Sequence, residues 1–211
     1  ESRCHFENAL KLFQNKKDLT GILLSWSNAV DTFFHDLQDL SPLDTWISLL
    51  DDILTKNVAF PSHYVQMRVF SSRFVSMVLR QPHHPEIEEQ AEYVFMHLHE
   101  YKDTHLQMLA EYYLSVHYLW TGNFARAGMI IGPLYQKTQR ENLVPFVCLL
   151  GKSVRIMHAW LTGSIQVSLR TAMSVLKHAR EAGVYVCYGH LMAQGICAAL
   201  SGGNLKTAEK L

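Results

Sequence analysis

A short phrase that ends one helix and starts the next recurs three times in the sequence, and its spacing constrains the fold more than any other feature. The three copies are Thr-Gly-Asn-Phe at 121–124, Thr-Gly-Ser-Ile at 162–165 and Gly-Gly-Asn-Leu at 202–205. Their shared glycines, Gly122, Gly163 and Gly203, are 41 and 40 residues apart. A fixed period of this size is typical of solenoids, in which each repeat stacks on its neighbours.

Each residue of the phrase has a mechanical role at a helical corner. Glycine adopts the left-handed backbone that ends a helix, and Asn or Ser accepts a hydrogen bond from the free N–H groups of the next helix. Two steps of 42 residues back from Gly122 reach Arg80 and Gln38, and both lie at breaks between apolar runs. We therefore expect repeat corners near 38, 80, 122, 163 and 203.

Apolar residues recur with a period of 3.6 between these breaks, and no hairpin dipeptide lies between alternating runs, so strands are not expected. The predicted fold is all-α, a right-handed superhelical solenoid of antiparallel helix pairs. The expected helices span 4–15, 18–37, 42–56, 62–80, 85–101, 103–121, 124–140, 143–162, 165–182, 185–202 and 205–211. Pro133 falls inside the seventh and is expected to kink or break it.

The composition narrows the class of protein further. Apolar residues make up 48% of the 211 residues, which excludes disorder, and 19 basic residues balance 19 acidic ones, which gives no field for nucleic acid or anionic membrane. No apolar run is long enough to span a bilayer. The four cysteines form no C-x-x-C pair, so free thiols in a cytoplasmic, reducing compartment are expected. The final helix stops after two turns, so residues 1–211 are expected to be one repeat domain cut from a larger protein.

The phrases Gly-Asn-Phe-Ala-Arg-Ala at 122–127 and Gly-Asn-Leu-Lys-Thr-Ala at 203–208 resemble the corner between the two helices of tetratricopeptide repeats. The period near 41 is longer than that family's usual 34. In this respect the chain is similar to the repeat region of large bacterial ATP-dependent transcription activators of the maltose-activator kind. The resemblance implies a repeat array that adjoins an ATPase module, although no phosphate-binding loop motif is present in this sequence.

Catalytic and metal-binding patterns are weak. His97 and His99 are about 200° apart on a helix, so they cannot chelate one ion together, and no cluster has zinc spacing in the linear sequence. Cys187 and His190 share a helix face but have no third, orienting residue, so core packing is the favoured interpretation. We therefore expect no catalytic residue, no metal and no cofactor, and a protein that is not an enzyme.

The first helix of each pair carries the residues that would line the concave groove of a tetratricopeptide array. Aligning the corners places apolar and aromatic side chains at these offsets. They are Phe70, Phe74, Met77, Tyr112, Val116, Met157 and Trp160. Such a groove would suit an amphipathic helix or an extended apolar peptide. The alternative is that these side chains pack one repeat against the next.

Charged residues interrupt the same apolar helices. Arg73, Glu111 and Arg155, together with Asp31 and Lys152, would be costly there unless paired or solvated. They form either ion pairs between repeats or polar contacts in a wet groove that binds a ligand. The leading functional hypothesis is an interaction scaffold that binds a protein segment, which could belong to the same parent chain. The alternative is a sensor for a sugar or another metabolite that controls an attached ATPase.

Overall fold

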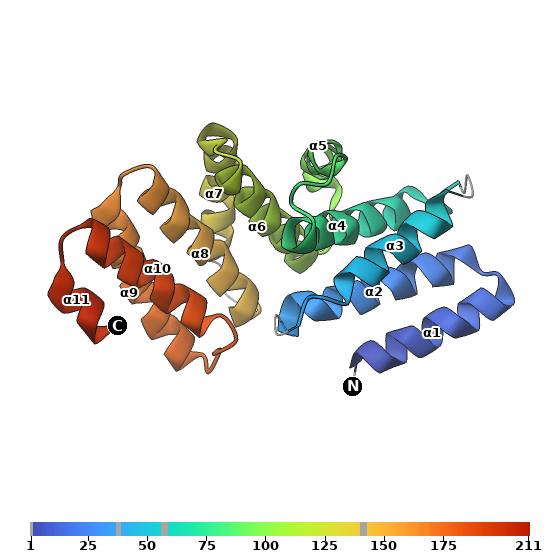
Figure 1. Cartoon of the computed structure of the whole chain (residues 1–211), viewed down its shortest axis with the longest axis horizontal. Coiled ribbons are helices and arrows are strands. Elements are labelled where there is room, and N and C mark those ends of the chain that lie inside the picture. Colours follow the sequence, from blue (N-terminus) through green and yellow to red (C-terminus); the bar gives the residue numbers. More distant parts are fainter. Residues whose placement is uncertain (1, 37–38, 56–58, 140–142) are drawn as a thin grey trace. The chain divides into compact units, whose positions relative to one another are not determined.

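The computed structural model describes residues 2–36, 39–55, 59–139 and 143–211, and these form helices joined by short turns, without a strand among them (Figure 1). The α-helices and one 3₁₀ helix, η1, follow in order. They are α1 (Ser2–Lys16), α2 (Leu19–Asp36), α3 (Leu43–Leu54), α4 (His63–Arg80), α5 (Ile87–His97), η1 (Leu98–Glu100), α6 (Thr104–Trp120), α7 (Phe124–Lys137), α8 (Pro145–Leu161), α9 (Ile165–Glu181), α10 (Tyr188–Ser201) and α11 (Leu205–Lys210). The all-α prediction is confirmed.

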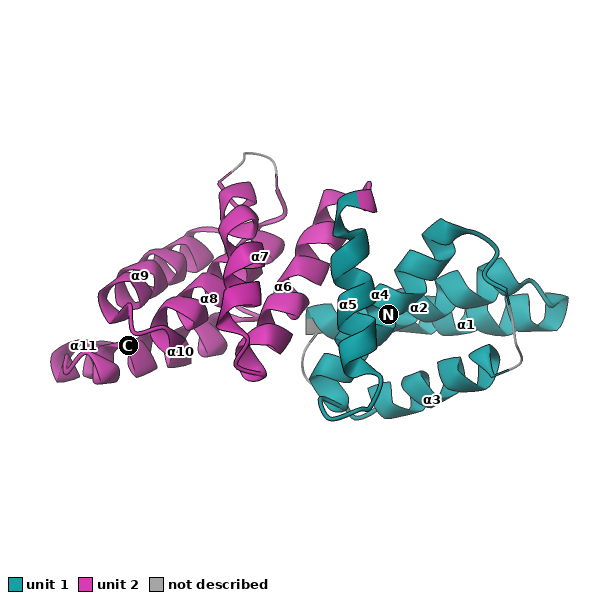
Figure 2. Cartoon of the chain, turned by 90° about the horizontal axis from the view of Figure 1, so that it is seen from above, with its two compact units in different colours: residues 1–99 teal, residues 100–211 magenta. Residues whose placement is uncertain are grey.

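The contacts divide the chain into two compact units, residues 1–99 and residues 100–211 (Figure 2). Within each unit, and among the residues described, a helix packs only against helices one or two places away along the chain. None of the helices in the described part of the chain combines the length and the apolar character that crossing a membrane requires.

The first unit is built around α4, which packs against α2, α3 and α5. Because α4 has neighbours on several sides, twelve of its 18 residues are buried, charged ones included. Phe74 and Met77 of α4 and Trp26 of α2 are fully buried. The Trp26 indole donates its N–H to the backbone carbonyl of Trp46 in α3 at 2.8 Å, so its polar edge is also satisfied.

The second unit places α6, α8 and α10 side by side and parallel. The backbone N–H of Val144 donates to His105 Nε2 at 3.4 Å, so α6 and α8 start together. The Trp160 indole N–H donates to Ser201 Oγ at 2.8 Å, so α8 and α10 end together. Each of these helices is followed by a partner helix, α7, α9 or α11, that packs against it. The three hairpin corners therefore lie along one edge of this unit.

The corners have the geometry that the recurring phrase predicts. Gly122, Gly163 and Gly203 adopt φ angles of 78°, 82° and 70°. At each corner the N–H that follows the glycine reaches a carbonyl five residues back; for Asn123 and Tyr118 the distance is 2.7 Å. Together with a bond from the glycine N–H to the carbonyl three residues back, this is a Schellman motif, which satisfies carbonyls at the helix end.

The polar residue after each glycine starts the next helix, with one exception. Asn123 and Asn204 accept backbone N–H groups of Arg126 and Thr207 at 3.2 and 3.1 Å, whereas Ser164 makes no such bond. The predicted break after Arg80 is also present, because α4 ends there. The predicted corner at Gln38 lies outside the described residues. Pro133 does not break α7, which continues to Lys137.

Candidate functional site

A pocket of about 350 Å³ opens on the second unit where α7, α8 and α9 meet. Its lining is polar and basic around a small apolar floor. The residues are Tyr135, Gln139, Lys152, Val167, Arg170, Thr171, Ser174 and Val175. The pocket is within the size range of small-molecule sites, which hold a few placed polar groups in a concave surface.

Helical spacing explains why these side chains converge. On α9 the lining positions 167, 170, 171 and 174 are three and four residues apart and so share one face. Tyr135 and Gln139 are likewise four apart at the end of α7. The buried Val175 belongs both to the pocket floor and to the core that α8, α9 and α10 share. The pocket therefore adjoins this core.

The charge of the pocket has one sign. Lys152 and Arg170 line it, and Arg155 lies one helical turn beyond Lys152 with its guanidinium 4.2 Å from the Tyr135 ring centre. No carboxylate is found among the described residues of the lining. Hydroxyl groups of Tyr135 and Ser174 add donors that can bind an anion, whereas Thr171 donates its hydroxyl to the backbone carbonyl of Val167 at 2.8 Å. The arrangement suits phosphate or carboxylate oxygens, which bind Arg and Lys by charge-assisted hydrogen bonds.

The structure places the predicted groove residues of the first unit in its interior. Phe74 and Met77 have no exposed surface, and the half-buried Phe70 packs edge-on between the rings of Phe60 and Tyr93, at 5.3 and 4.6 Å. These side chains therefore pack helix against helix, as in the packing alternative, and do not line an open groove.

Two of the predicted groove residues of the second unit, Tyr112 and Trp160, join neighbouring helices. Val116 is buried, and packing around the Tyr112 hydroxyl raises its pKa to about 12, an effect that a hydrogen bond with Ser153 of α8 partly offsets. Trp160 is tied to α10 through Ser201, and Met157 is half-buried. Tyr112 and Trp160 thus connect α6 with α8 and α8 with α10.

Three of the five charged residues that interrupt the apolar helices form ion pairs. Asp31 of α2 binds Arg68 of α4 at 2.6 Å, and Glu111 of α6 binds Lys137 of α7 at 2.5 Å. Burial nevertheless raises the pKa of Glu111, with Lys137 opposing the shift.

Arg73, 5% exposed, binds both Asp51 at 2.9 Å and Glu86 at 2.7 Å. Lys152 and Arg155, by contrast, are at or beside the pocket. Lys152 and Arg155 are thus predicted from the sequence, whereas Arg170 has no signal there because only the packing of α9 brings it to the pocket.

The Cys187 and His190 pair shows no sign of nucleophilic activation. Cys187 is buried, and burial raises the pKa of its thiol, whereas a nucleophilic cysteine needs a depressed pKa. His190 instead has its Nε2 at 2.9 Å from the side-chain nitrogen of Gln194. Among the four cysteines, Cys148 is buried as well, while Cys4 and Cys197 are exposed.

An apolar edge accompanies the three corners of the second unit. Its members, which we call the corner edge, are large side chains next to the corner glycines. They are Trp120 (59% exposed), Phe124 (37%), Leu161 (38%), Leu200 (52%) and Leu205 (63%). Exposed apolar side chains that gather on one edge favour contact with another protein surface.

Comparisons with known proteins do not identify the chain. No protein-family model matches it, and neither the curated proteins nor the solved structures contain a significant match.

Proposed function

We propose that the chain is a non-catalytic binding scaffold, a tetratricopeptide-like solenoid with a repeat near 41 residues, whose second unit senses a small anionic metabolite. Two hydrogen bonds support the repeat, because each joins equivalent positions 41 residues apart. They link Ser72 with Asp31 in the first unit and Trp160 with Ser201 in the second. In a regulator of the kind that the sequence resembles, ligand binding would shift an equilibrium in an attached ATPase.

The observation that carries the sensor proposal is the basic pocket. Three separate helices contribute to it, so a bound anion would bridge α7, α8 and α9. A ligand of this kind stabilises the folded state because it binds only when all three helices are in place. Phosphorylated sugars and small dicarboxylates have the required size and negative charge.

The test is calorimetric titration of the chain with glucose 6-phosphate, succinate and, as an uncharged comparison, glucose. We expect saturable binding of at least one anion and none of glucose. Lys152→Met and Arg170→Met should each weaken binding about tenfold or more, since each removes a charge-assisted hydrogen bond. The matched control is Lys177→Met, because Lys177 lies on α9 outside the pocket lining and its side chain is 77% exposed. Equal loss in the control would exclude the pocket as the site.

The corner edge favours a second candidate function, binding of an amphipathic helix from another protein segment. The probe is a panel of Leu-rich amphipathic peptides with scrambled controls, and the exposed Trp120 indole reports binding by its fluorescence. Leu205→Glu should abolish the response, because it places a charge in the apolar contact. If scrambled peptides give the same response, the corner edge does not select helices.

A further inference from the structure

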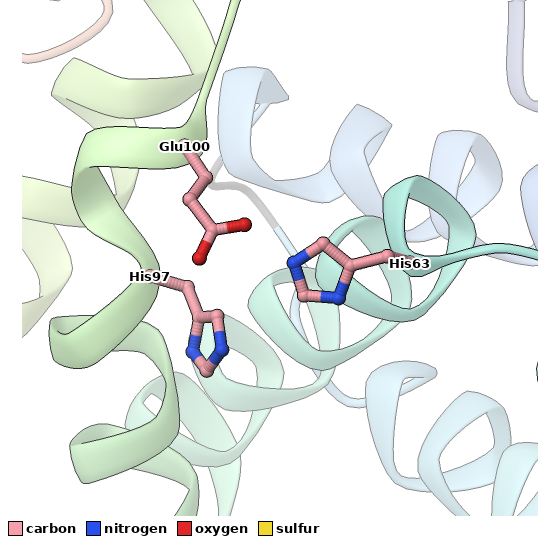
Figure 3. A group of neighbouring side chains, drawn as sticks. All are labelled: His63, His97 and Glu100. Carbon is pink, nitrogen blue, oxygen red and sulfur yellow. The ribbon is translucent and has the colours of Figure 1, made fainter.

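Three side chains with metal-binding atoms come together in a place that the linear sequence does not reveal. His63 is the first residue of α4, His97 is the last residue of α5, and Glu100 ends η1. One ligand atom from each lies within 4.8 Å of the other two. Figure 3 shows the Glu100 carboxylate directed toward the two imidazole rings.

Local geometry accounts for the two members on one helix. His97 and Glu100 are three residues apart, and η1 continues α5 without a break, so both side chains emerge from one face of the same helical stretch. His63 joins them because α4 packs against α5 within the first unit. The rings of His63 and His97 have their centres 5.4 Å apart.

Tyr93 orients the His97 ring in the way that metal-binding histidines require. The backbone carbonyl of Tyr93 lies 2.8 Å from His97 Nδ1, and the Tyr93 ring stacks on the imidazole at 4.2 Å with an angle of 25°. A carbonyl oxygen can only accept, so Nδ1 carries a proton, and Nε2 is the nitrogen through which a neutral ring would bind a metal ion. A backbone carbonyl on the second ring nitrogen is the usual support of a histidine ligand.

We propose that His63, His97 and Glu100 form a binding site for a divalent transition-metal ion, with Zn²⁺ as the best fit. Two neutral imidazoles and one carboxylate are a ligand set that Zn²⁺ accepts, with water in the fourth position. Zn–ligand bonds of about 2.0–2.1 Å place tetrahedral ligand atoms roughly 3.3 Å apart. The exposed side chains of His63 and Glu100 can close that difference by rotation.

The helix ends at this site have opposite effects on a bound cation. The carboxyl end of α5 and η1 favours a cation, whereas the amino end of α4 opposes it. The Glu100 carboxylate therefore supplies the decisive negative charge. A bound ion would tie the start of α4 to the end of α5.

The experiment uses the 211-residue chain without a histidine tag, treated with chelator and titrated with ZnCl₂ in a calorimeter. We expect one equivalent to bind. His63→Ala, His97→Ala and Glu100→Gln should each weaken binding about tenfold or more, because each removes one of three ligands. His99→Ala is the matched control, since His99 lies between His97 and Glu100 but is not in the ligand group. Zn²⁺ should also raise the Tm of the wild type and of the control.

Three results of the calorimetric titrations would contradict the proposed zinc site. Absence of a saturable equivalent, equal weakening by His99→Ala, or unchanged binding by His63→Ala and His97→Ala would each overturn it. If a variant does not fold, the wild type is titrated with ZnCl₂ instead and its imidazole NMR signals are followed. Shifts of the His63 and His97 signals support the site, and no shift at either ring excludes it.

Discussion

At the residue scale, replacing Gly122 tests how much the left-handed backbone of a corner glycine contributes to stability. Its φ is 78°, and a Cβ added there would meet no atom within 4 Å. Gly122→Val therefore creates no clash with a neighbouring residue, and its cost comes from the left-handed backbone that a β-branched side chain resists. We expect a loss of about 1–2 kcal/mol in the free energy of unfolding, measured by urea denaturation.

Gly189 provides the control for that substitution. It is exposed near the start of α10, and an added Cβ there also meets no atom within 4 Å, but its φ is not positive. Gly189→Ala should be neutral or stabilising by no more than about 1 kcal/mol, because alanine favours the helix. If Gly122→Val were as stable as the parent, the corner assignment would lose its basis.

At the element scale, Arg73 of α4 is held by carboxylates from both sides, and the two ways of breaking this contact are not equivalent. Asp51 and Glu86 have side chains 39% and 52% exposed, so water can replace the arginine for them. Arg73 itself is almost fully buried. We expect Arg73→Met to cost about 1 kcal/mol and the double variant Asp51→Asn, Glu86→Gln to cost about 3 kcal/mol, because only the second leaves a buried charge unpaired.

Acid titration of the same variants gives an independent check. The hydrogen bond from Arg73 holds the pKa of Glu86 below its ordinary value of 4.5. The folded state thus binds this proton less readily than the unfolded state, so the stabilisation is complete above pH 4.5 and is lost as the pH falls through the lowered pKa. The wild type should lose more stability than Arg73→Met between pH 4.5 and pH 3 in thermal melts. A parallel decline would show that the pair contributes nothing.

The helices themselves were predictable because their signals are local. Cap residues such as Asn123 and glycines such as Gly163 act on the next few residues. The expected helix bounds differ from the observed ones by at most four residues, apart from the expected ends at 37, 56 and 140, which lie outside the described residues. The sites were harder to predict. Arg170 reaches the pocket and His63 reaches His97 only through packing between helices, and no spacing in the sequence encodes such contacts.

At the scale of the whole molecule, each unit has its own core, so each should respond to its own substitutions. Leu50 in α3 and Leu149 in α8 are fully buried, and truncating either to Ala should cost about 2–5 kcal/mol. In single-tryptophan backgrounds, Trp26 reports on the first unit and Trp160 on the second. We expect Leu50→Ala to lower the denaturation midpoint reported by Trp26 but not the one reported by Trp160. Leu149→Ala should have the opposite effect, with a lower midpoint at Trp160 only. Coincident shifts at both probes would mean one cooperative unit.

The pairing of each helix with helices one or two places away also has a kinetic consequence. Folding rates rise when contacts join residues close in sequence, because little chain entropy is lost before each contact forms. Here a hairpin such as α8 and α9 can form before the next helix pair folds. Its contacts do not require a segment that is distant in the sequence. The same order of events suits synthesis on the ribosome, where each hairpin can fold as it emerges.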